Sequence, residues 1–210
     1  VRGHGAALQI RSLLDRNQFD DPLGEAERAG ISSATWPLFG LLWPSGHVLA
    51  EAMLVFEIGE KRILEIGCGL ALASIVLHRR GGNVTASDHH PLAASFLREN
   101  LRLNSLPDMK YRTGNWGACT VHLGKFDLII GSDVLYDRSQ PLAVSNFLDE
   151  HSAENVEVMI VDPDRGNHAA FSKRMCALGY SHHAQIVRQL ADGTPYKGRI
   201  HHYARKTGAA

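Results

Sequence analysis

The sequence has few cysteines and no excess of charge of either sign, and both absences argue against classes of protein. Its 210 residues include three cysteines, Cys68, Cys119 and Cys176, which lie far apart. This odd number at wide spacing argues against a disulfide framework and predicts free thiols in a reducing compartment, so we expect a cytoplasmic protein. Basic and acidic residues both number 22, so no net field indicates nucleic acid or an anionic membrane as a partner.

The sequence also lacks a long apolar run and closely spaced metal ligands. No run approaches the roughly 18 apolar residues that a membrane span needs, and no charged-then-apolar signal opens the chain. Twelve histidines include three adjacent pairs, at 89–90, 182–183 and 201–202. Because adjacent residues on a strand point to opposite faces, such a pair cannot chelate one ion. We therefore expect no metal site and no membrane partner.

Short apolar runs alternate with helical patterns from residue 61 onward. We expect strands at 62–66, 83–88, 109–113, 126–133 and 157–162, and a terminal hairpin whose turn is 192–195. Helices are expected at 47–56 and 70–80. We expect three more: one that begins at Pro91, one with Pro141 in its first turn, and one that is capped by Asn167. Gly81-Gly82 and Gly179 are typical helix stops.

This order of elements predicts an α/β fold. Continuous apolar strands between helices are typical of a Rossmann-like, doubly wound and mostly parallel sheet, here of seven strands, with helices on both faces. The C-terminal hairpin adds an antiparallel strand. We expect residues 1–42 to form an N-terminal extension that packs on the core and residues 43–210 to form the main domain.

A glycine-spaced turn, EIGCGLALA, follows the first predicted strand and is typical of a nucleotide-like ligand. Asp88 ends the second strand about twenty residues later, where an acidic side chain can bind both ribose hydroxyls. This pattern predicts an adenosine-containing ligand, either a dinucleotide or S-adenosylmethionine. A dinucleotide turn needs a small residue where this sequence has Leu72, so nicotinamide binding is disfavoured.

Four runs, LEIGCGLALAS, ASDHHPLA, GNWG and FDLIIGSDVLYD, resemble the successive motifs of class I, seven-strand S-adenosylmethionine-dependent methyltransferases. They are most similar to the branch of protein-lysine methyltransferases and their bacterial relatives, as is LLWPSGHVLAEAM upstream. The resemblance covers residues 43–162. It implies that residues 43–210 are a methyltransferase domain with S-adenosylmethionine as cofactor, a protein as the expected acceptor and a small-molecule acceptor as the alternative.

The resemblance implies eight residues that contact the cofactor: Trp43, Glu65, Gly67, Gly69, Asp88, Asn115, Trp116 and Ser132. Glu65 and the two glycines would line the methionine half, and Asp88 would bind the ribose. The residues after the third strand would meet the adenine, and Trp43 would close over the cofactor. Plain core packing is the alternative for both tryptophans. Ala71 stands where many members of the family have a third glycine.

Asp133 and Tyr136 match the acidic-x-x-aromatic motif of the lysine branch and are the expected catalytic residues. Asp133 would hold and orient the acceptor amine, and the ring of Tyr136 would wall the channel. Capping of the following turn is the alternative for Asp133. Asp162 and Arg165 face the same side and are either acceptor contacts or loop residues. Two other functions stay open: methylation of a protein histidine or a small-molecule amine, and cofactor binding without catalysis.

Overall fold

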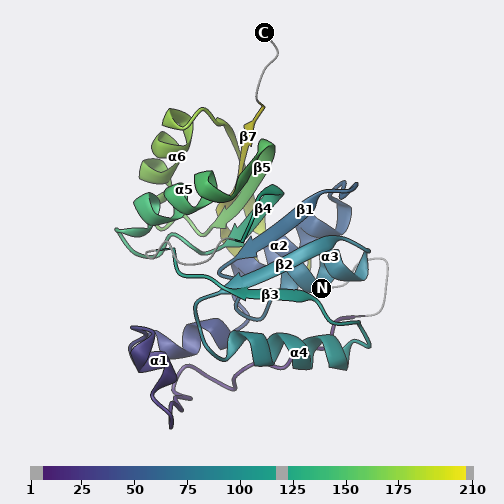
Figure 1. The fold of residues 1–210 in the computed structure, drawn as a ribbon, viewed down its shortest axis with the longest axis vertical. Coiled ribbons are helices and arrows are strands. Elements are labelled where there is room, and N and C mark those ends of the chain that lie inside the picture. Colours follow the sequence, from purple (N-terminus) through teal and green to yellow (C-terminus); the bar gives the residue numbers. More distant parts are fainter. Residues whose placement is uncertain (1–6, 117–122, 207–210) are drawn as a thin grey trace.

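A seven-stranded sheet forms the centre of the computed structural model, which describes residues 7–116 and 123–206 (Figure 1). The strand order is β3-β2-β1-β4-β5-β7-β6; the first five strands are parallel, while β7 runs antiparallel to both β5 and β6. The expected fold class is confirmed. The strands are β1 Arg62–Ile66, β2 Asn83–Asp88, β3 Lys110–Thr113, β4 Phe126–Ser132, β5 Ser152–Asp162, β6 Ser181–Gln189 and β7 Pro195–Arg205.

The helices lie near their expected positions, with shifted ends. They are α1 Glu25–Arg28, η1 Trp36–Gly40, α2 Pro44–Val55, α3 Leu72–Arg79, α4 Ala93–Leu103, α5 Gln140–His151 and α6 His168–Ala177. Helix α3 starts two residues later than expected because Ala71 has a left-handed backbone conformation. Helix α4 starts after a turn that contains Pro91, and in this turn the Leu92 N–H donates a hydrogen bond to the His90 ring. Strand β5 begins at Ser152, five residues before the prediction, because it pairs with Phe126 past a bulge.

Asn167 occupies the position before α6 but does not cap it with its side chain, contrary to the prediction. Its amide instead donates a 2.7 Å hydrogen bond to the Leu135 carbonyl oxygen. The amide therefore joins the start of α6 to the loop that follows β4. A local rule of helix capping fails here because a partner from another part of the chain is better placed.

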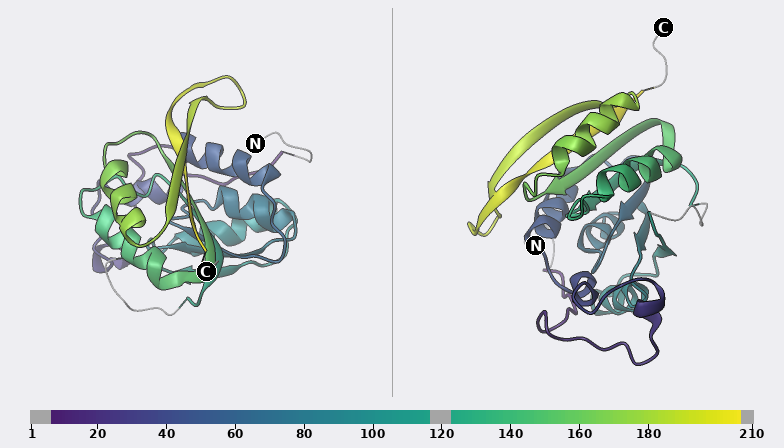
Figure 2. Two further views of the ribbon diagram at one scale, coloured as in Figure 1. Left: turned by 90° about the horizontal axis from the view of Figure 1, so that it is seen from above. Right: turned by 90° about the vertical axis from the view of Figure 1, so that its left-hand side faces the viewer.

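Alternate residues of the strands pack into two cores, one on each face of the sheet. On β1, Ile63 belongs to the core under α2 and α3, while Leu64 and Ile66 belong to the core under α5 and α6. Leu128 and Ile129 divide in the same way on β4. The two helical layers are visible on either side of the sheet in Figure 2. Both faces are therefore covered, as expected from unbroken apolar strands.

The chain reverses its direction of winding between β1 and β4. From β1 it proceeds outward to β2 and β3, and then returns to β4 on the other side of β1. Ligands of doubly wound sheets bind beyond the carboxyl ends of the strands at this reversal. A ligand is consequently expected at the loops that follow β1, β2, β4 and β5.

The stretch Trp36–Val55 has the length and mean hydropathy of a membrane span, 20 residues and 1.4, which the sequence analysis did not recognise. In the structure this stretch is divided into the short helix η1 and the helix α2, which begins at Pro44. Helix α2 buries Leu49 and Met53 in the core against the sheet. The length and composition of this stretch therefore fit a buried core helix as well as a membrane span.

The N-terminal segment packs against α4 and η1 through a small core of its own, formed by Leu13, Ala26, Trp36, Phe39 and Ala93. The Leu13 N–H donates a 2.7 Å hydrogen bond to the Gly40 carbonyl oxygen. A side chain at Gly40 would overlap Leu13, since its Cβ would lie 2.5 Å from Leu13 Cγ. These contacts place the segment beside the glycine turn, because Gly69 lies against Phe39.

We expect Leu13→Ala to lower the free energy of unfolding by about 2–3 kcal/mol, because Leu13 is 7 % exposed and the cavity would be only partly refilled. Its neighbour Leu14, which is 93 % exposed, is the matched control, and Leu14→Ala should stay within about 0.5 kcal/mol. Urea unfolding of the three proteins measures both values. Equal effects of the two substitutions would show that the extension does not pack as described.

Candidate cofactor and acceptor site

The turn after β1 is held by three left-handed residues at alternate positions. Gly67, Gly69 and Ala71 have φ angles of 56°, 51° and 59°. A side chain would not fit at either glycine: a Cβ at Gly67 would lie 2.9 Å from Val134, and one at Gly69 would lie 2.8 Å from the Phe39 carbonyl oxygen. The glycines are therefore required by both conformation and space. Ala71 tolerates the same conformation at some cost.

Glu65 lies inside the protein, where it caps helix α3 from the neighbouring strand. It is 3 % exposed, and its Oε2 accepts a 2.8 Å hydrogen bond from the Ser74 N–H in the first turn of α3. Burial raises the pKa of Glu65 to about 7, and the nearby charge of Asp88 adds to the rise. A carboxyl with this pKa is partly protonated near neutral pH, so a cation bound nearby would favour its charged form.

Asp88 fastens the end of β2 to the glycine turn. Its Oδ2 accepts a 2.7 Å hydrogen bond from the Gly69 N–H, and its Oδ1 accepts one of 2.8 Å from the His90 N–H. Burial raises the pKa of this carboxyl, while the two N–H donors oppose the rise. Each oxygen retains a further lone pair, so the group can still accept hydrogen bonds from a ligand.

The residues after β3 bring an aromatic ring onto the glycine turn. Atoms of the Trp116 ring lie 3.1 Å from the place where a Cβ of Gly67 would be, and this ring packs against the core under α5. Gly114 permits the approach, since a Cβ there would lie 2.3 Å from Ser87 Oγ. Asn115 is exposed beside them. Residues 117–122, which follow, lie outside the described part of the chain.

Trp43 and Ser132 lie at the ends of α2 and β4. Trp43 is half-buried just before α2, with its indole N–H donating a 2.8 Å hydrogen bond to the Leu38 carbonyl oxygen and the Arg16 guanidinium 5.0 Å from the centre of its ring. Ser132 Oγ lies 3.7 Å from the place of a Cβ on Gly46, in the first turn of α2. Ser132 thus belongs to the contact between α2 and the strand ends, whereas these contacts of Trp43 are with the N-terminal segment.

Asp133 is paired with Arg165, which the sequence analysis did not predict. Arg165 Nε and Nη2 lie 2.6 Å and 2.8 Å from the two oxygens of Asp133, a two-pronged pair in which the Asp133 side chain is 13 % exposed. Asp133 has a φ of 55°, and its N–H donates to the Val161 carbonyl oxygen. Within residues 7–116 and 123–206 its carboxylate bonds to Arg165 and caps no helix. Tyr136 lies nearby and is 53 % exposed.

The structure therefore gathers the glycine turn, Asp88 and Trp116 around one point, and places Asp133 at the neighbouring strand end. Phe39 and His90 complete the first group without having been predicted: their rings stack 3.7 Å apart and are both buried. No motif marked Phe39. Its only sequence signal was the apolar run before Trp43, which we assigned to the extension.

The adjacent histidines take part in separate contacts. His182 stacks on His201 and His183 on His202 across the hairpin, while His89 bonds to the Ala29 carbonyl oxygen. A different group has the arrangement of metal ligands: Asp162, Asp164 and His168, each with one ligand atom within 4.8 Å of the others. This group follows β5, beside Arg165.

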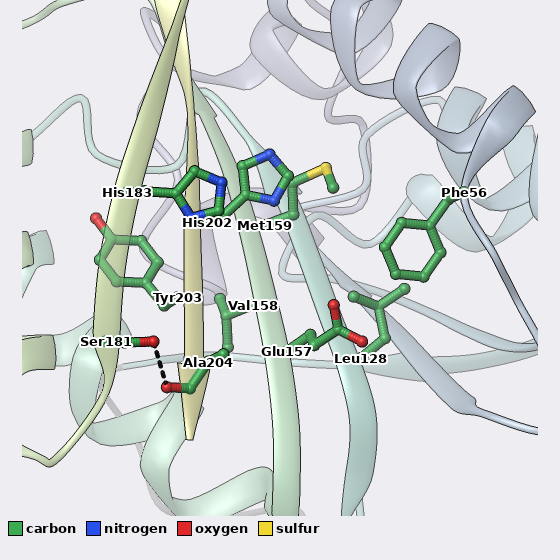
Figure 3. Close-up of a pocket in the computed structure, with 10 residues that line it drawn as sticks. All are labelled: Phe56, Leu128, Glu157, Val158, Met159, Ser181, His183, His202, Tyr203 and Ala204. Atoms are coloured by element: carbon green, nitrogen blue, oxygen red, sulfur yellow. Dashed lines mark hydrogen bonds between the residues drawn. The ribbon is translucent and has the colours of Figure 1, made fainter. Parts of the chain in front are cut away.

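A pocket of about 80 Å³ lies away from these strand ends, between the hairpin, the middle of β5 and the end of α2 (Figure 3). It is lined by Phe56, Leu128, Glu157, Val158, Met159, Ser181, His183, His202, Tyr203 and Ala204. Its volume is well below the roughly 300 Å³ at which ligand pockets begin. We therefore do not assign the cofactor to it.

Residues 37–175 match the family described as lysine methyltransferase, which covers more than half of the chain. The chain belongs to the lysine methyltransferase family. This confirms the resemblance drawn from the glycine turn and the strand ends.

Two relatives and one solved structure define what this lysine methyltransferase family member is similar to. The electron transfer flavoprotein beta subunit lysine methyltransferase of Mus musculus is 29 % identical over 80 % of this chain and 64 % of its own length. A histone-arginine methyltransferase of Rattus norvegicus, METTL23, is 31 % identical over 46 % of each chain. The magnesium protoporphyrin IX methyltransferase of Synechocystis, solved with bound S-adenosylmethionine, has a TM-score of 0.62, covers 77 % of this chain and 80 % of its own, and is 18 % identical, which shows the fold alone.

Glu65→Gln tests the buried carboxyl of this family member. A carboxyl whose pKa is about 7 in the folded protein and 4.5 otherwise contributes stability when protonated, and loses that contribution as the pH rises from 4.5 through 7. Glutamine is uncharged and keeps an oxygen for the Ser74 N–H. We therefore expect the variant to be more stable than the wild type at pH 8, by up to about 3 kcal/mol, and the difference to shrink toward pH 5.

Urea unfolding at both pH values provides the measurement. The control is Glu99→Gln, because Arg102 lowers the pKa of Glu99 and the effect of that substitution should have the opposite sign at pH 8. A pH-independent effect of Glu65→Gln would contradict the assignment.

Proposed function

We propose that this protein transfers a methyl group from S-adenosylmethionine to the side-chain amine of a lysine in a protein. Membership in the lysine methyltransferase family supports the reaction. The observation that carries the proposal is the juxtaposition of two unlike groups at neighbouring strand ends: a glycine turn fastened by Asp88, and the shielded carboxylate of Asp133. The first suits an adenosine-containing cofactor, and the second suits an amine.

The turn fits the cofactor because its backbone is open to a ligand at points where any side chain would intrude. Gly67 and Gly69 would approach the methionine half, with Glu65 beneath them, and Asp88 would accept from the ribose hydroxyls through its remaining lone pairs. Trp116 would face the adenine. When bound, the cofactor supplies a methyl carbon on a positively charged sulfur, which an amine lone pair can attack directly.

The acceptor amine must present its lone pair in line with the carbon–sulfur bond. The N–C bond forms as the C–S bond breaks, the cofactor leaves as a neutral thioether, and the amine loses a proton to solvent. Asp133 would accept a hydrogen bond from the amine N–H and so orient the lone pair. Arg165 holds this carboxylate in one position and compensates its charge. Tyr136, exposed at the rim, would contact the aliphatic part of the lysine.

Lysine is favoured over other acceptors by the family and by the relative that covers most of this chain. Because the chain spans 64 % of that relative, its acceptor protein is not transferred to this one. The arginine-modifying relatives match less than half of the chain. The proposed compartment is a reducing one, the cytoplasm, supported by the free thiols of Cys68 and Cys176.

Labelled S-adenosylmethionine, incubated with the protein and a lysate of source cells lacking its gene, tests the function. We expect label in protein, and methyl-lysine after acid hydrolysis, at a rate well above that of a heat-inactivated control. Methyl-arginine or methyl-histidine in place of methyl-lysine would show that another side chain is the acceptor, while the methyl transfer itself would stand. Label confined to small molecules would refute a protein acceptor, and absence of any transfer with intact cofactor binding would indicate a binding module.

Asp133→Asn should lower turnover by about two orders of magnitude, the low end of what a well-positioned group contributes. Affinity for the cofactor should be retained, since Asp133 lies past the glycine turn. The control is Asp137→Asn, four residues on in the same loop, where the carboxylate accepts hydrogen bonds from the Ser139 N–H and hydroxyl and turnover should persist. Single-turnover rates, cofactor titrations and thermal melts separate these outcomes. Wild-type turnover of a folded Asp133→Asn protein would remove Asp133 from the acceptor site.

A further inference from the structure

The loop from β5 to α6 brings three metal-binding side chains together. Asp162 is the last residue of β5, Asp164 follows Pro163, and His168 is the first residue of α6. One ligand atom from each lies within 4.8 Å of the others, and His168 Nδ1 is 3.8 Å from Asp162 Oδ1. Two ligand atoms that are each about 2.1 Å from one tetrahedral ion lie about 3.4 Å apart, so modest side-chain shifts would bring these atoms to coordinating distance.

All three residues have a buried polar atom without a hydrogen-bond partner: Asp162 Oδ2, Asp164 Oδ1 and His168 Nδ1. The Asp162 side chain has no exposed surface at all. Buried polar atoms in folded proteins are nearly always paired, and an unpaired group usually marks a water or an ion. Asp164 Oδ1 has a charged neighbour in Arg199, whereas the fully enclosed Asp162 Oδ2 has no partner, which indicates that a ligand belongs beside it.

The charges around the group also favour a cation. Asp133 is already compensated by Arg165, which leaves Asp162 and Asp164. Arg199 Nε lies 3.2 Å from Asp164 Oδ1, but without hydrogen-bond geometry, and its side chain is 39 % exposed. The fully buried Asp162 carboxylate and the partly buried Asp164 carboxylate, whose side chain is 17 % exposed, face this one guanidinium, and burying an uncompensated charge is costly.

We propose that Asp162, Asp164 and His168 bind a divalent transition-metal ion, with Zn²⁺ as the best match. Two carboxylate oxygens and an imidazole nitrogen are ligands that Zn²⁺ accepts, and a water would complete four-coordination. Mg²⁺ is disfavoured, because it selects oxygen ligands in a strict octahedron. In the sequence this group has the spacing D-x-D-x-x-x-H, which differs from the adjacent histidine pairs and was not predicted as a metal site.

An ion here would fix the loop that carries Arg165. The Arg165 N–H donates a 3.1 Å hydrogen bond to Asp162 Oδ1, and Asp164 directly precedes Arg165. The ion would thus hold the guanidinium in position on Asp133 from two sides. This consequence rests on the proposed methyl transfer, whereas the metal site itself does not.

The test measures binding of Zn²⁺ itself to the full chain. The protein is stripped with a chelator, dialysed and titrated with Zn²⁺ by calorimetry, with Mg²⁺ in parallel. We expect one Zn²⁺ per chain, a dissociation constant below about 10 µM, a higher melting temperature on binding and little response to Mg²⁺. His168→Gln and Asp162→Asn should each weaken binding at least tenfold, following loss of one of three ligands.

His183→Gln is the matched control, because this exposed histidine of the hairpin lies outside the group and should bind Zn²⁺ as the wild type does. If Asp162→Asn fails to fold, His168→Gln carries the test, since its side chain is 23 % exposed and replacing it leaves no buried charge. No stoichiometric binding, or equal binding by His168→Gln and the wild type, would overturn the site. Neither readout uses methyl transfer, so its failure is distinguishable from failure of the proposed function.

Discussion

The hydrogen bond from the Gly69 N–H to Asp88 is the contact on which the rest of the candidate site depends. It joins the turn after β1 to the end of β2, and so fixes a turn whose residues are left-handed at alternate positions. A chain with three such residues within five has little intrinsic preference for that shape. Two carboxylates stabilise this conformation by accepting backbone hydrogen bonds: Asp88 accepts from the turn, and Glu65 accepts from the first turn of the helix that follows.

The same arrangement explains why the other elements approach so closely. With no side chain at Gly67, Val134 and the Trp116 ring can both reach the turn from the loops after β4 and β3. With none at Gly69, the Phe39 carbonyl can approach from the N-terminal segment. Three segments far apart in sequence thus converge on two glycines. A site assembled in this way is sensitive to the turn, because a change of its backbone would displace all three.

The fold, and the meeting of the glycine turn with Asp88, could be predicted from the sequence because their signals are local. Apolar runs of strand length, glycines after the first strand and an acidic residue ending the second are each readable within a few residues. The partners of Asp133, Asn167 and Phe39 were not predictable in this way. Arg165, Leu135 and Gly69 lie about thirty residues from them along the chain and meet them only through the sheet order. Pairing across such distances leaves no periodic pattern.

In the proposed reaction, the pairing of Asp133 with Arg165 would resolve a conflict in the chemistry of amine methylation. An amine must lose its proton before it can attack, and an unpaired carboxylate beside it would stabilise the protonated form. Without any carboxylate, however, nothing would orient the lone pair. A carboxylate held by a guanidinium meets both needs: its field is largely compensated, while its oxygens keep lone pairs that accept a hydrogen bond from the neutral amine. The positive sulfur of the bound cofactor would act in the same direction by disfavouring a second cation nearby. The site would therefore select the neutral amine by the balance of its charges, with no group needed to remove the proton.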